Sequence, residues 1–292
     1  MKYVELGTNN MGLGPIVASG KTKDIISVKD LEDVVVIRSR DDITAGDGAR
    51  HKMIVRTADH PGKGELSNIA TCRIFEYLKK RGIPTAYIKQ LNEASFLAYK
   101  CDMVSLELVS RRYTYGSWLK RNPGHEPLER FDKPAHEMYL KTNDRQWQGK
   151  RLFGDDPLMT IEDGYALLYD PKMPLDQQLP QYLRDYPLKD SLPLLVECTR
   201  IQEAVFLALE EAWIGLGLKF VDLKIEVGIT ADGRLVLADV IDADSGRLLD
   251  KNNEHIDKEP FRKTDNPDTI LDLMANKLMR FADLTAQFPK VS

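Results

Sequence analysis

The chain has 292 residues, of which 42% are apolar and 29% are charged, and its formal net charge is -4. These values are typical of a globular protein with one large domain or two lobes, and they exclude the basic footprint of a nucleic-acid-binding protein. No apolar run reaches the ~18 residues that a transmembrane helix requires. Three isolated cysteines without CxxC spacing, together with an N-terminus that lacks a signal-peptide core, indicate a reducing compartment. We therefore expect a cytoplasmic protein with no nucleic acid or membrane partner.

The N-terminal third predicts a mostly antiparallel sheet with one packed helix. Residues 1–20 are rich in Gly and Asn and are expected to be irregular. The helix carries apolar residues at helical spacing and ends before Gly82, a C-cap signal. The strands are predicted at Asp24–Val28, Val34–Ser39, Pro84–Lys89 and Ser95–Lys100, and the helix at Ser67–Arg81.

A glycine-lysine turn precedes the first of these strands. Gly14 and Gly20 are separated by five residues rather than four, and Thr22 leads into a strand rather than a helix, so the P-loop motif is excluded. Gly20 is nevertheless followed by Lys21 and, after Thr22, by Lys23. A glycine beside lysine on a β-turn can cover phosphates. The alternative is a basic surface turn.

An aspartate-rich loop follows Val34–Ser39 with the sequence DDITAGDGARH, and it includes Asp47. Asp and Gly collect in turns for local reasons, but an ordered loop of this length is typical of a functional segment. Later in the chain, a strand predicted at Met103–Val109 leads into RRYTYGSWLKRNPG. Its arginines and lysines surround Gly116-Ser117, and guanidinium groups suit carboxylates or phosphates. The alternative is a basic helix face above packed aromatic residues.

The C-terminal half predicts two amphipathic helices around a hairpin, while residues 122–192 are the least informative part of the chain. The first helix is expected at Thr199–Trp213, with a Thr199…Gln202 capping box. The second is expected from Asp268 to about Thr285. Between them, alternating apolar residues in KFVDLKIEVGIT predict a strand, and Asp232-Gly233 predicts a two-residue type I′ turn.

The predicted register of this hairpin brings two carboxylates face to face. It places Glu226 opposite Asp239, while one face is wholly apolar through the pairs Ile229–Val236, Val227–Ala238 and Ile225–Val240. Opposed Cβ atoms lie roughly 4.5–5.5 Å apart, so the two charges favour a cation between them. Mg²⁺ binds through one or two carboxylates plus substrate phosphates. The alternative is a solvated face whose carboxylates pair with Lys and Arg.

Seven segments occur in one order over residues 19 to about 265: SGKTKDII, DDITAGDGAR, CDMVSLELVSRRYTYGSWLKRNPG, FGDDPL, FVDLKIEVG, VLADVIDADSGRLLDK and DKEPFR. With them the chain resembles the phosphoribosylaminoimidazole-succinocarboxamide synthase (SAICAR synthetase) family, and RRYTYGSWLKRNPG resembles the animal-type synthetase domain, here without a fused carboxylase domain. The resemblance implies a two-lobed α+β, SAICAR synthase-like (ATP-grasp/kinase-like) fold. It implies an antiparallel N-terminal, ATP-covering lobe in residues 1–105 and a larger C-terminal α/β lobe in residues 106–292.

The family's reaction joins L-aspartate to the carboxylate of carboxyaminoimidazole ribonucleotide (CAIR), with ATP and Mg²⁺. The resemblance therefore implies an amide-forming ligase of de novo purine biosynthesis that acts through an acyl phosphate. It also implies a homo-oligomer whose partners are the small-molecule substrates. A nucleotide-binding regulator without catalysis, and a kinase with a different acceptor, stay open as alternatives.

On the nucleotide side, the resemblance implies contacts with the phosphates, adenine and ribose of ATP. Lys21 matches a lysine that covers the phosphates, Lys224 matches a lysine that faces phosphate, and Glu107 lies near the ribose. The full set implied for the nucleotide is Gly20, Lys21, Lys23, Met103, Glu107 and Lys224. Glu226 and Asp239 match the family's Mg²⁺ carboxylates.

On the substrate side, Arg111 and Ser117, in R-x₅-S spacing, match residues that hold the imidazole nucleotide or aspartate. Arg247 and Arg262 match later basic positions, and Asp47 lies in the loop that approaches the substrate. The residues implied in catalysis are Lys21, Lys224 and Arg111.

Some positions depart from the family pattern. Gly246 replaces cysteine or tryptophan and Leu249 replaces tryptophan, while Tyr113 and Tyr115 stand where small or aliphatic residues are usual. These tyrosines are expected to reshape the nucleotide pocket. Residues 158–192 are expected to be longer than in the short form of the family.

Overall fold

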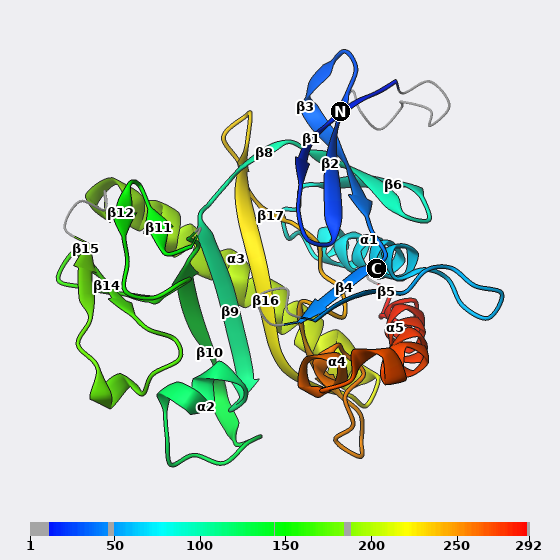
Figure 1. The fold of residues 1–292 in the computed structure, drawn as a ribbon. Helices are drawn as coiled ribbons and strands as arrows, with labels where there is room; N and C mark the ends of the chain where they lie inside the picture. The colour runs from blue at the N-terminus through cyan, green and yellow to red at the C-terminus, as the bar shows by residue number, and fades with distance from the viewer. Residues whose placement is uncertain (1–11, 46–49, 143, 184–187, 291–292) are drawn as a thin grey trace.

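The structure is a computed structural model that describes residues 12–45, 50–142, 144–183 and 188–290. Its strands form two main sheets, which Figure 1 shows side by side, with the N-terminal sheet in blue and the longer sheet in green and yellow. The molecule is therefore an α+β protein with two lobes, as the sequence predicts.

The first sheet is antiparallel and has the strand order β1-β2-β3-β7-β6. It buries apolar residues against α1, where Phe75 meets Tyr87 and Phe96 at ring distances of 5.8 and 6.1 Å. The prediction of an irregular N-terminus is wrong for β1, which pairs with β2 along its length. The elements are β1 (Leu13–Ser19), β2 (Lys23–Val28), β3 (Leu31–Ser39), β6 (Tyr87–Asn92), β7 (Ser95–Tyr99) and α1 (Lys63–Lys80), with a separate hairpin of β4 (Asp42–Ala45) and β5 (Arg50–Met53).

The second sheet follows the order β15-β14-β13-β10-β9-β16-β17, and β8 and β18 also pair with β16. The predicted strand at Met103–Val109 is divided in two, because the chain leaves β8 after Met103 and enters β9 at Leu106. The strands are β8 (Cys101–Met103), β9 (Leu106–Tyr113), β10 (Arg130–Leu140), β13 (Leu158–Glu162), β14 (Tyr165–Tyr169), β15 (Gln181–Leu183), β16 (Lys219–Thr230), β17 (Leu235–Ala238) and β18 (Gly246–Leu249), with a small hairpin of β11 (Gln146–Trp147) and β12 (Lys150–Arg151).

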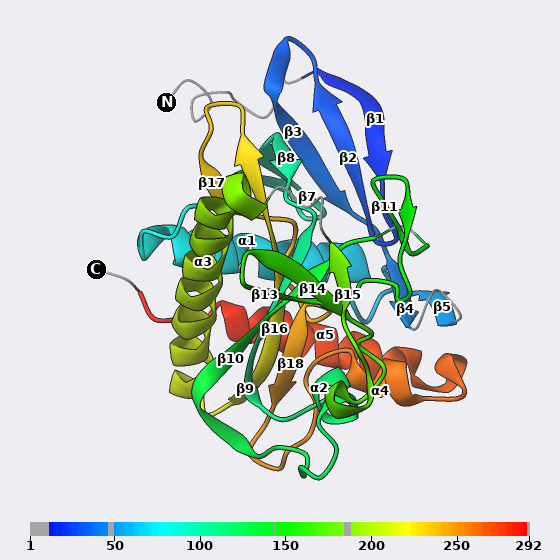
Figure 2. The same ribbon diagram turned by 90° about the vertical axis from the view of Figure 1, so that its left-hand side faces the viewer.

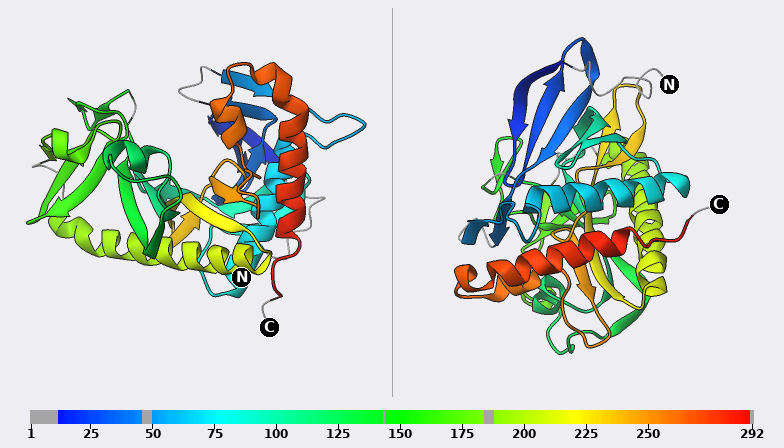
Figure 3. Two further views of the ribbon diagram at one scale, coloured as in Figure 1. Left: turned by 90° about the horizontal axis from the view of Figure 1, so that it is seen from below. Right: turned by 90° about the vertical axis from the view of Figure 1, so that its right-hand side faces the viewer.

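Two long helices cover the sheets. Figure 3, left, shows α3 (Leu188–Gly215) running beneath the second sheet, where Phe206 stacks on Phe220 of β16 at 5.1 Å. Figure 2 shows α5 (Leu271–Thr285) beside α1, so the C-terminal helix packs on the N-terminal lobe. The division at residue 105 stays a prediction. The remaining helices are α2 (Ser117–Arg121), α4 (Glu259–Lys263) and the 3₁₀ turns Leu175–Gln177 and Pro267–Ile270.

The predicted start of α3 is wrong. The helix begins at Leu188, eleven residues before the expected capping box, and Pro193 lies inside it. The Thr199 hydroxyl donates to the carbonyl oxygen of Leu195 at 3.0 Å, within the helix, rather than capping a first turn. A proline near the start of a helix removes one hydrogen bond, and packing against the sheet outweighs that loss.

The predicted hairpin register is also wrong, by one residue. The loop has three residues, Ala231–Gly233, because Gly233 adopts a φ of +81° and its N–H donates to the carbonyl oxygen of Thr230 at 2.8 Å. The observed pairs are Glu226–Ala238, Val227–Leu237, Gly228–Val236 and Ile229–Leu235. Val236 and Leu237 are both fully buried. Apolar alternation could not distinguish the registers, because both faces of β17 are covered.

The change of register moves Asp239 out of the sheet. Strand β17 ends at Ala238, so Glu226 has no carboxylate opposite it. Asp239 has a φ of +64°, in the left-handed region that few residues other than glycine adopt. The chain therefore turns sharply at Asp239, and its carboxylate points toward the first lobe, where it pairs with Lys23.

Candidate active site

A cavity of about 250 Å³ lies where the β1–β2 turn meets β16 and the loop that follows β17. Cationic and anionic side chains alternate around it, so at this cavity the two lobes present charged rather than apolar surface. Its charged lining residues are Lys21, Lys23, Lys224, Glu226, Asp239, Asp242, Asp244 and Lys258.

The β1–β2 turn supplies two lysines to this cavity. The turn closes through the Gly20 N–H, which donates to the carbonyl oxygen of Lys23 at 2.8 Å. Arg40, the residue after β3, holds the turn by donating to the carbonyl oxygens of Gly20 and Lys21 at 2.7 and 2.8 Å. Among the described residues the Lys21 ammonium has no ion-pair or hydrogen-bond partner, and the side chain is exposed at the cavity. Arg40 was not predicted, because only the β2–β3 pairing brings it to the turn.

Lys23 lines the same cavity and forms an ion pair with Asp239. Burial lowers the pKa of Lys23 to about 8, with repulsion from Lys224 adding to the effect and attraction to Glu226 opposing it. The turn therefore presents one exposed cation and one that already faces a carboxylate.

Strand β16 places two more charges in the cavity. The Lys224 ammonium lies 3.0 Å from Glu107 of β9 and 3.2 Å from Glu226, and Lys141 lies 2.6 Å from the other oxygen of Glu226. Burial raises the pKa of Glu226, but attraction to Lys224 and Lys141 outweighs it and lowers the pKa overall. Glu226 is thus held as a carboxylate at the cavity wall.

The loop after β17 adds two aspartates that sequence reasoning did not single out. Lys63 is 2% exposed and lies 3.1 Å from Asp244 and 3.8 Å from Asp242, and Lys258 lies 3.1 Å from Asp244. Burial raises the pKa of Asp244, but attraction to Lys63 and Lys258 outweighs it, so the pKa is well below its usual range. The Asp244 Oδ1 atom is buried without a hydrogen-bond partner among the described residues. The acidic run VIDADSG was a usable signal for these residues, whereas Lys63 comes from a distant helix.

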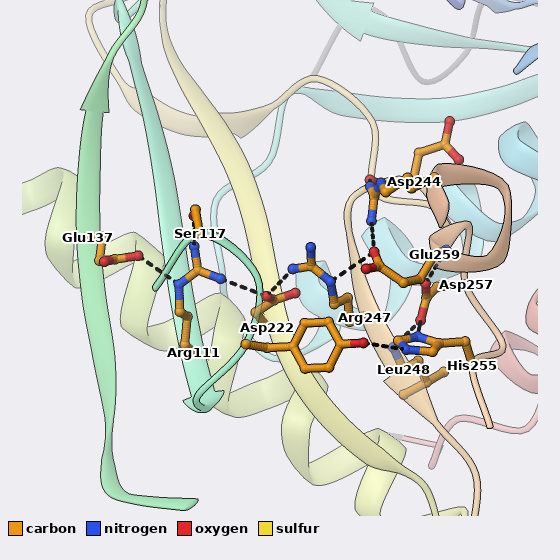
Figure 4. A network of polar contacts seen from close by, with 12 residues as sticks. Arg111, Ser117, Glu137, Asp222, Asp244, Arg247, Leu248, His255, Asp257 and Glu259 are labelled. Atoms are coloured by element: carbon orange, nitrogen blue, oxygen red, sulfur yellow. Dashed lines mark hydrogen bonds and ion pairs between the residues drawn. The ribbon is translucent and has the colours of Figure 1, made fainter. Parts of the chain in front are cut away.

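Beside the cavity, arginines and carboxylates alternate in one network, shown in Figure 4. Arg111 donates to Asp222 at 2.8 Å, to Glu137 at 2.7 Å and to Ser117 at 3.3 Å. Asp222 also accepts from Arg247 at 2.5 Å. The R-x₅-S spacing therefore does bring Arg111 and Ser117 together, but Arg111 is 4% exposed and all its described donors face protein acceptors.

The network continues toward the cavity through Glu259, which is paired with Arg247 at 3.1 Å and Arg262 at 3.2 Å. Arg262 then donates to the carbonyl oxygen of Asp244 at 3.0 Å. The Arg247 guanidinium lies 4.8 Å from the ring centre of Tyr115. The side chains of Arg247 and Arg262 are 17% and 29% exposed, against 5% for Arg111, so they present more guanidinium surface to a bound anion.

Three other predicted site residues are Glu107, Met103 and Asp47. Glu107 joins the cavity charges through Lys224, as described above. Met103 is 41% exposed on β8, and its strand pairs with β16 at Gly228. Asp47 lies outside the described residues.

Within residues 12–45, 50–142, 144–183 and 188–290, no group of three or more His, Cys, Asp or Glu side chains is arranged to hold a metal ion. None of the helices in these ranges is long and apolar enough to cross a membrane.

Fold and site together define the class: a two-lobed α+β protein with a charged cavity at the meeting of its two sheets and an arginine–carboxylate network beside it. A family model adds the particular assignment. The chain belongs to the SAICAR synthetase family, whose model matches residues 16–154 and 191–270. The interval between these ranges contains β13, β14 and β15. It overlaps residues 158–192, which the sequence predicts to be longer than in the short form of the family.

The relatives are of two kinds. A phosphoribosylaminoimidazole-succinocarboxamide synthase from Chloroflexus aggregans is 32% identical over 97% of this chain and 100% of its own length. A probable multifunctional protein of Caenorhabditis elegans is 33% identical over 94% of this chain and 59% of its own length. A bifunctional carboxylase/synthetase of Drosophila melanogaster is 33% identical over 86% of this chain and 52% of its own length. The chain thus spans little more than half the length of these multifunctional relatives. Closeness to the animal-type domain stays a prediction, because the two kinds differ by one percentage point of identity.

Solved structures agree in fold. The synthase of Ehrlichia chaffeensis has a TM-score of 0.68 at 21% identity and covers 94% of this chain and 100% of its own. A type-2 SAICAR synthetase in complex with ADP has a TM-score of 0.66 at 24% identity, and the match covers 94% of this chain and 99% of that one. The SAICAR synthase of Saccharomyces cerevisiae in complex with SAICAR has a TM-score of 0.64 at 15% identity, and the match covers 95% of this chain and 96% of that one.

Proposed function

We propose that the chain catalyses the ATP-dependent joining of L-aspartate to the carboxylate of CAIR, which yields SAICAR, ADP and phosphate. Family membership supports this activity, and solved relatives bind ADP and SAICAR. The observation that carries the proposal is the continuity of the charged cavity with the arginine network through Arg262 and Asp244. One site offers cations for a triphosphate, and its neighbour offers cations for carboxylates.

In this proposal ATP lies over the β1–β2 turn. Gly20 allows the phosphates to approach the backbone, and Lys21 is the exposed cation that meets them. Lys23 and Lys224 then face the negative charge of the ATP phosphates from the cavity wall. The base and ribose extend toward β8 and β9, where Met103 presents an exposed thioether and Glu107 a carboxylate for ribose hydroxyls.

Mg²⁺ fits the same cavity. Glu226 and Asp239 line it, and the buried Oδ1 of Asp244 adds an oxygen that has no hydrogen-bond partner among the described residues. Two carboxylates without a third ligand suit Mg²⁺, which takes its remaining ligands from waters and phosphates. When bound, the metal ion would neutralise charge that develops on the transferring phosphoryl group. The lysines that now contact Glu226 and Asp239 would then be free to turn toward the nucleotide.

The chemistry requires activation of a carboxylate, which is a poor electrophile. A CAIR carboxylate oxygen attacks the γ-phosphorus of ATP, the bond to the bridging oxygen breaks, and ADP leaves. The aspartate amine attacks the resulting acyl phosphate, loses a proton, and displaces inorganic phosphate as the amide forms. Lys21 and Lys224 stabilise charge on the transferring phosphoryl group, and most of the rate comes from this positioning and electrostatic stabilisation.

The anionic substrates occupy the arginine network. Arg247 and Arg262 reach their carboxylates or phosphate, while Arg111 fixes Ser117 and Asp222 beneath them. Asp47, which lies outside the described residues, is proposed as a further contact of these substrates. We further propose that the protein acts in the cytoplasm as a homo-oligomer.

The test is steady-state ADP release by purified protein with ATP, Mg²⁺, CAIR and aspartate. We expect release that requires both CAIR and aspartate and that yields SAICAR in equal amount. ADP release that needs neither acceptor, or needs only one of them, would contradict a ligase and favour a kinase or hydrolase.

A further inference from the structure

The arginine–carboxylate network has a second end, which leads away from the cavity. Glu137 of β10 accepts from Arg111 at 2.7 Å and from the Tyr139 hydroxyl at 3.0 Å through one oxygen. Its other oxygen accepts from Arg121, the last residue of α2. Figure 4 shows Glu137 and Asp222 on opposite sides of Arg111. Arg111 is therefore held from two directions, only one of which faces the substrate side.

A contribution to folding stability does not by itself explain the buried Arg121–Glu137 ion pair. The Arg121 side chain is fully buried, and its Nε and Nη1 atoms have no hydrogen-bond partner among the described residues. Buried donors without acceptors destabilise a fold, and replacing a buried ion pair with apolar side chains is often neutral or stabilising. A charged pair kept at this position therefore points to a role in orientation.

The geometry indicates what is oriented. Helix α2 begins at Ser117, whose hydroxyl meets Arg111 at 3.3 Å, and it ends at Arg121. The short helix is thus fastened at both ends to Arg111, directly through Ser117 and indirectly through Glu137. Loss of the Arg121–Glu137 contact would free one end of α2 and release one anchor of the carboxylate that faces the Arg111 Nε.

We propose that Glu137 and Arg121 are positioning residues for Arg111 and Ser117. They do not touch substrate. They set the plane of the Arg111 guanidinium and the place of the Ser117 hydroxyl, and so determine how tightly CAIR or aspartate binds. This assignment rests on the proposed function, since Arg111 and Ser117 have this importance only if the network holds those substrates.

The test compares Glu137→Gln with Glu210→Gln. Glu210 forms a buried bidentate pair with Arg112, at 2.5 and 2.6 Å, next to Arg111 in sequence but directed toward α3. In Glu137→Gln we expect KM for CAIR or aspartate to rise about tenfold, equivalent to ~1.4 kcal/mol, with KM for ATP unchanged and kcat within about threefold. Glu210→Gln should lower the unfolding temperature without changing any KM.

A second pair of variants covers the case in which Glu137→Gln does not fold. Arg121→Met should raise the same KM, and Arg121→Lys, which keeps the charge, should recover most of the wild-type value. If wild type turns over both substrates while Glu137→Gln or Arg121→Met keeps wild-type KM values, the positioning role is overturned and the ligase function stands. If wild type neither binds nor converts CAIR, the proposed function fails and this assignment falls with it.

Discussion

At the residue scale, lysine–carboxylate pairs dominate the cavity. Glu226 and Asp239 each contact a lysine, although they were expected to face each other across a hairpin. These contacts agree with the alternative stated for the sequence, in which nearby cations pair with the carboxylates. In the proposed function, a nucleotide with its metal ion would replace these lysines at the two carboxylates.

Asp239→Asn tests the metal assignment. The substitution keeps the shape of the side chain but removes its charge, so we expect kcat to fall by about a hundredfold or more. The free energy of unfolding should change by about 1 kcal/mol, because Asp239 lies at a strand end and is partly exposed. Asp232→Asn in the turn of the same hairpin, exposed and paired with Arg234, is the control. Activity within a few fold of wild type would show that Asp239 does not hold the metal.

His136 gives a pH dependence of stability outside the site. Burial lowers its pKa below the usual value, Arg112 adds to this and Glu203 opposes it, and Ser110 lies 2.9 Å from Nδ1. The unfolded chain therefore takes up the proton more readily, so stability is complete above about pH 6.5 and declines as the pH falls below it. His136→Asn should show a smaller loss of urea midpoint from about pH 7.5 to about 5.5. Equal losses in both proteins would refute this account.

At the scale of elements, β16 organises the site. It pairs with β9, β17, β8 and β18, and so places Asp222 beside Arg111 and Arg247 while Lys224 and Glu226 face the cavity. Close packing between β16 and β18 fixes this arrangement. A Cβ atom at Gly246 would overlap the carbonyl oxygen of Asp222, so glycine at this position matters for the position of Arg247.

Gly246→Ala should push β18 away from β16. We expect a loss of about 1–3 kcal/mol in the free energy of unfolding from overpacking, and a higher KM for CAIR or aspartate because Arg247 moves off Asp222. Urea unfolding and steady-state rates measure the two effects. Gly215→Ala, at the end of α3 with no atom near its Cβ position, is the control and should be neutral or slightly stabilising. An unchanged KM in Gly246→Ala would mean that β18 does not set the position of Arg247.

At the scale of the whole molecule, local pattern was enough for β2, β3, β7 and β16 and for the Gly20–Lys23 turn, because a few adjacent residues determine each of them. It missed β1 and the strands between residues 122 and 192. It was not enough for the hairpin register, since both faces of β17 are buried and a glycine selected the longer loop. Lys63 and Arg40 were also beyond reach, because contacts between distant elements bring them to the site. The family resemblance supplied the residue roles that spacing alone left open.

The most direct measurement of the central claim follows oxygen from CAIR. CAIR labelled with heavy oxygen in its carboxylate is converted with ATP, Mg²⁺ and aspartate, and the products are analysed by mass spectrometry. Our account predicts one labelled oxygen in inorganic phosphate for each SAICAR formed, because the carboxylate oxygen leaves with the phosphoryl group. Phosphate without label, or ADP formed without SAICAR, would contradict it.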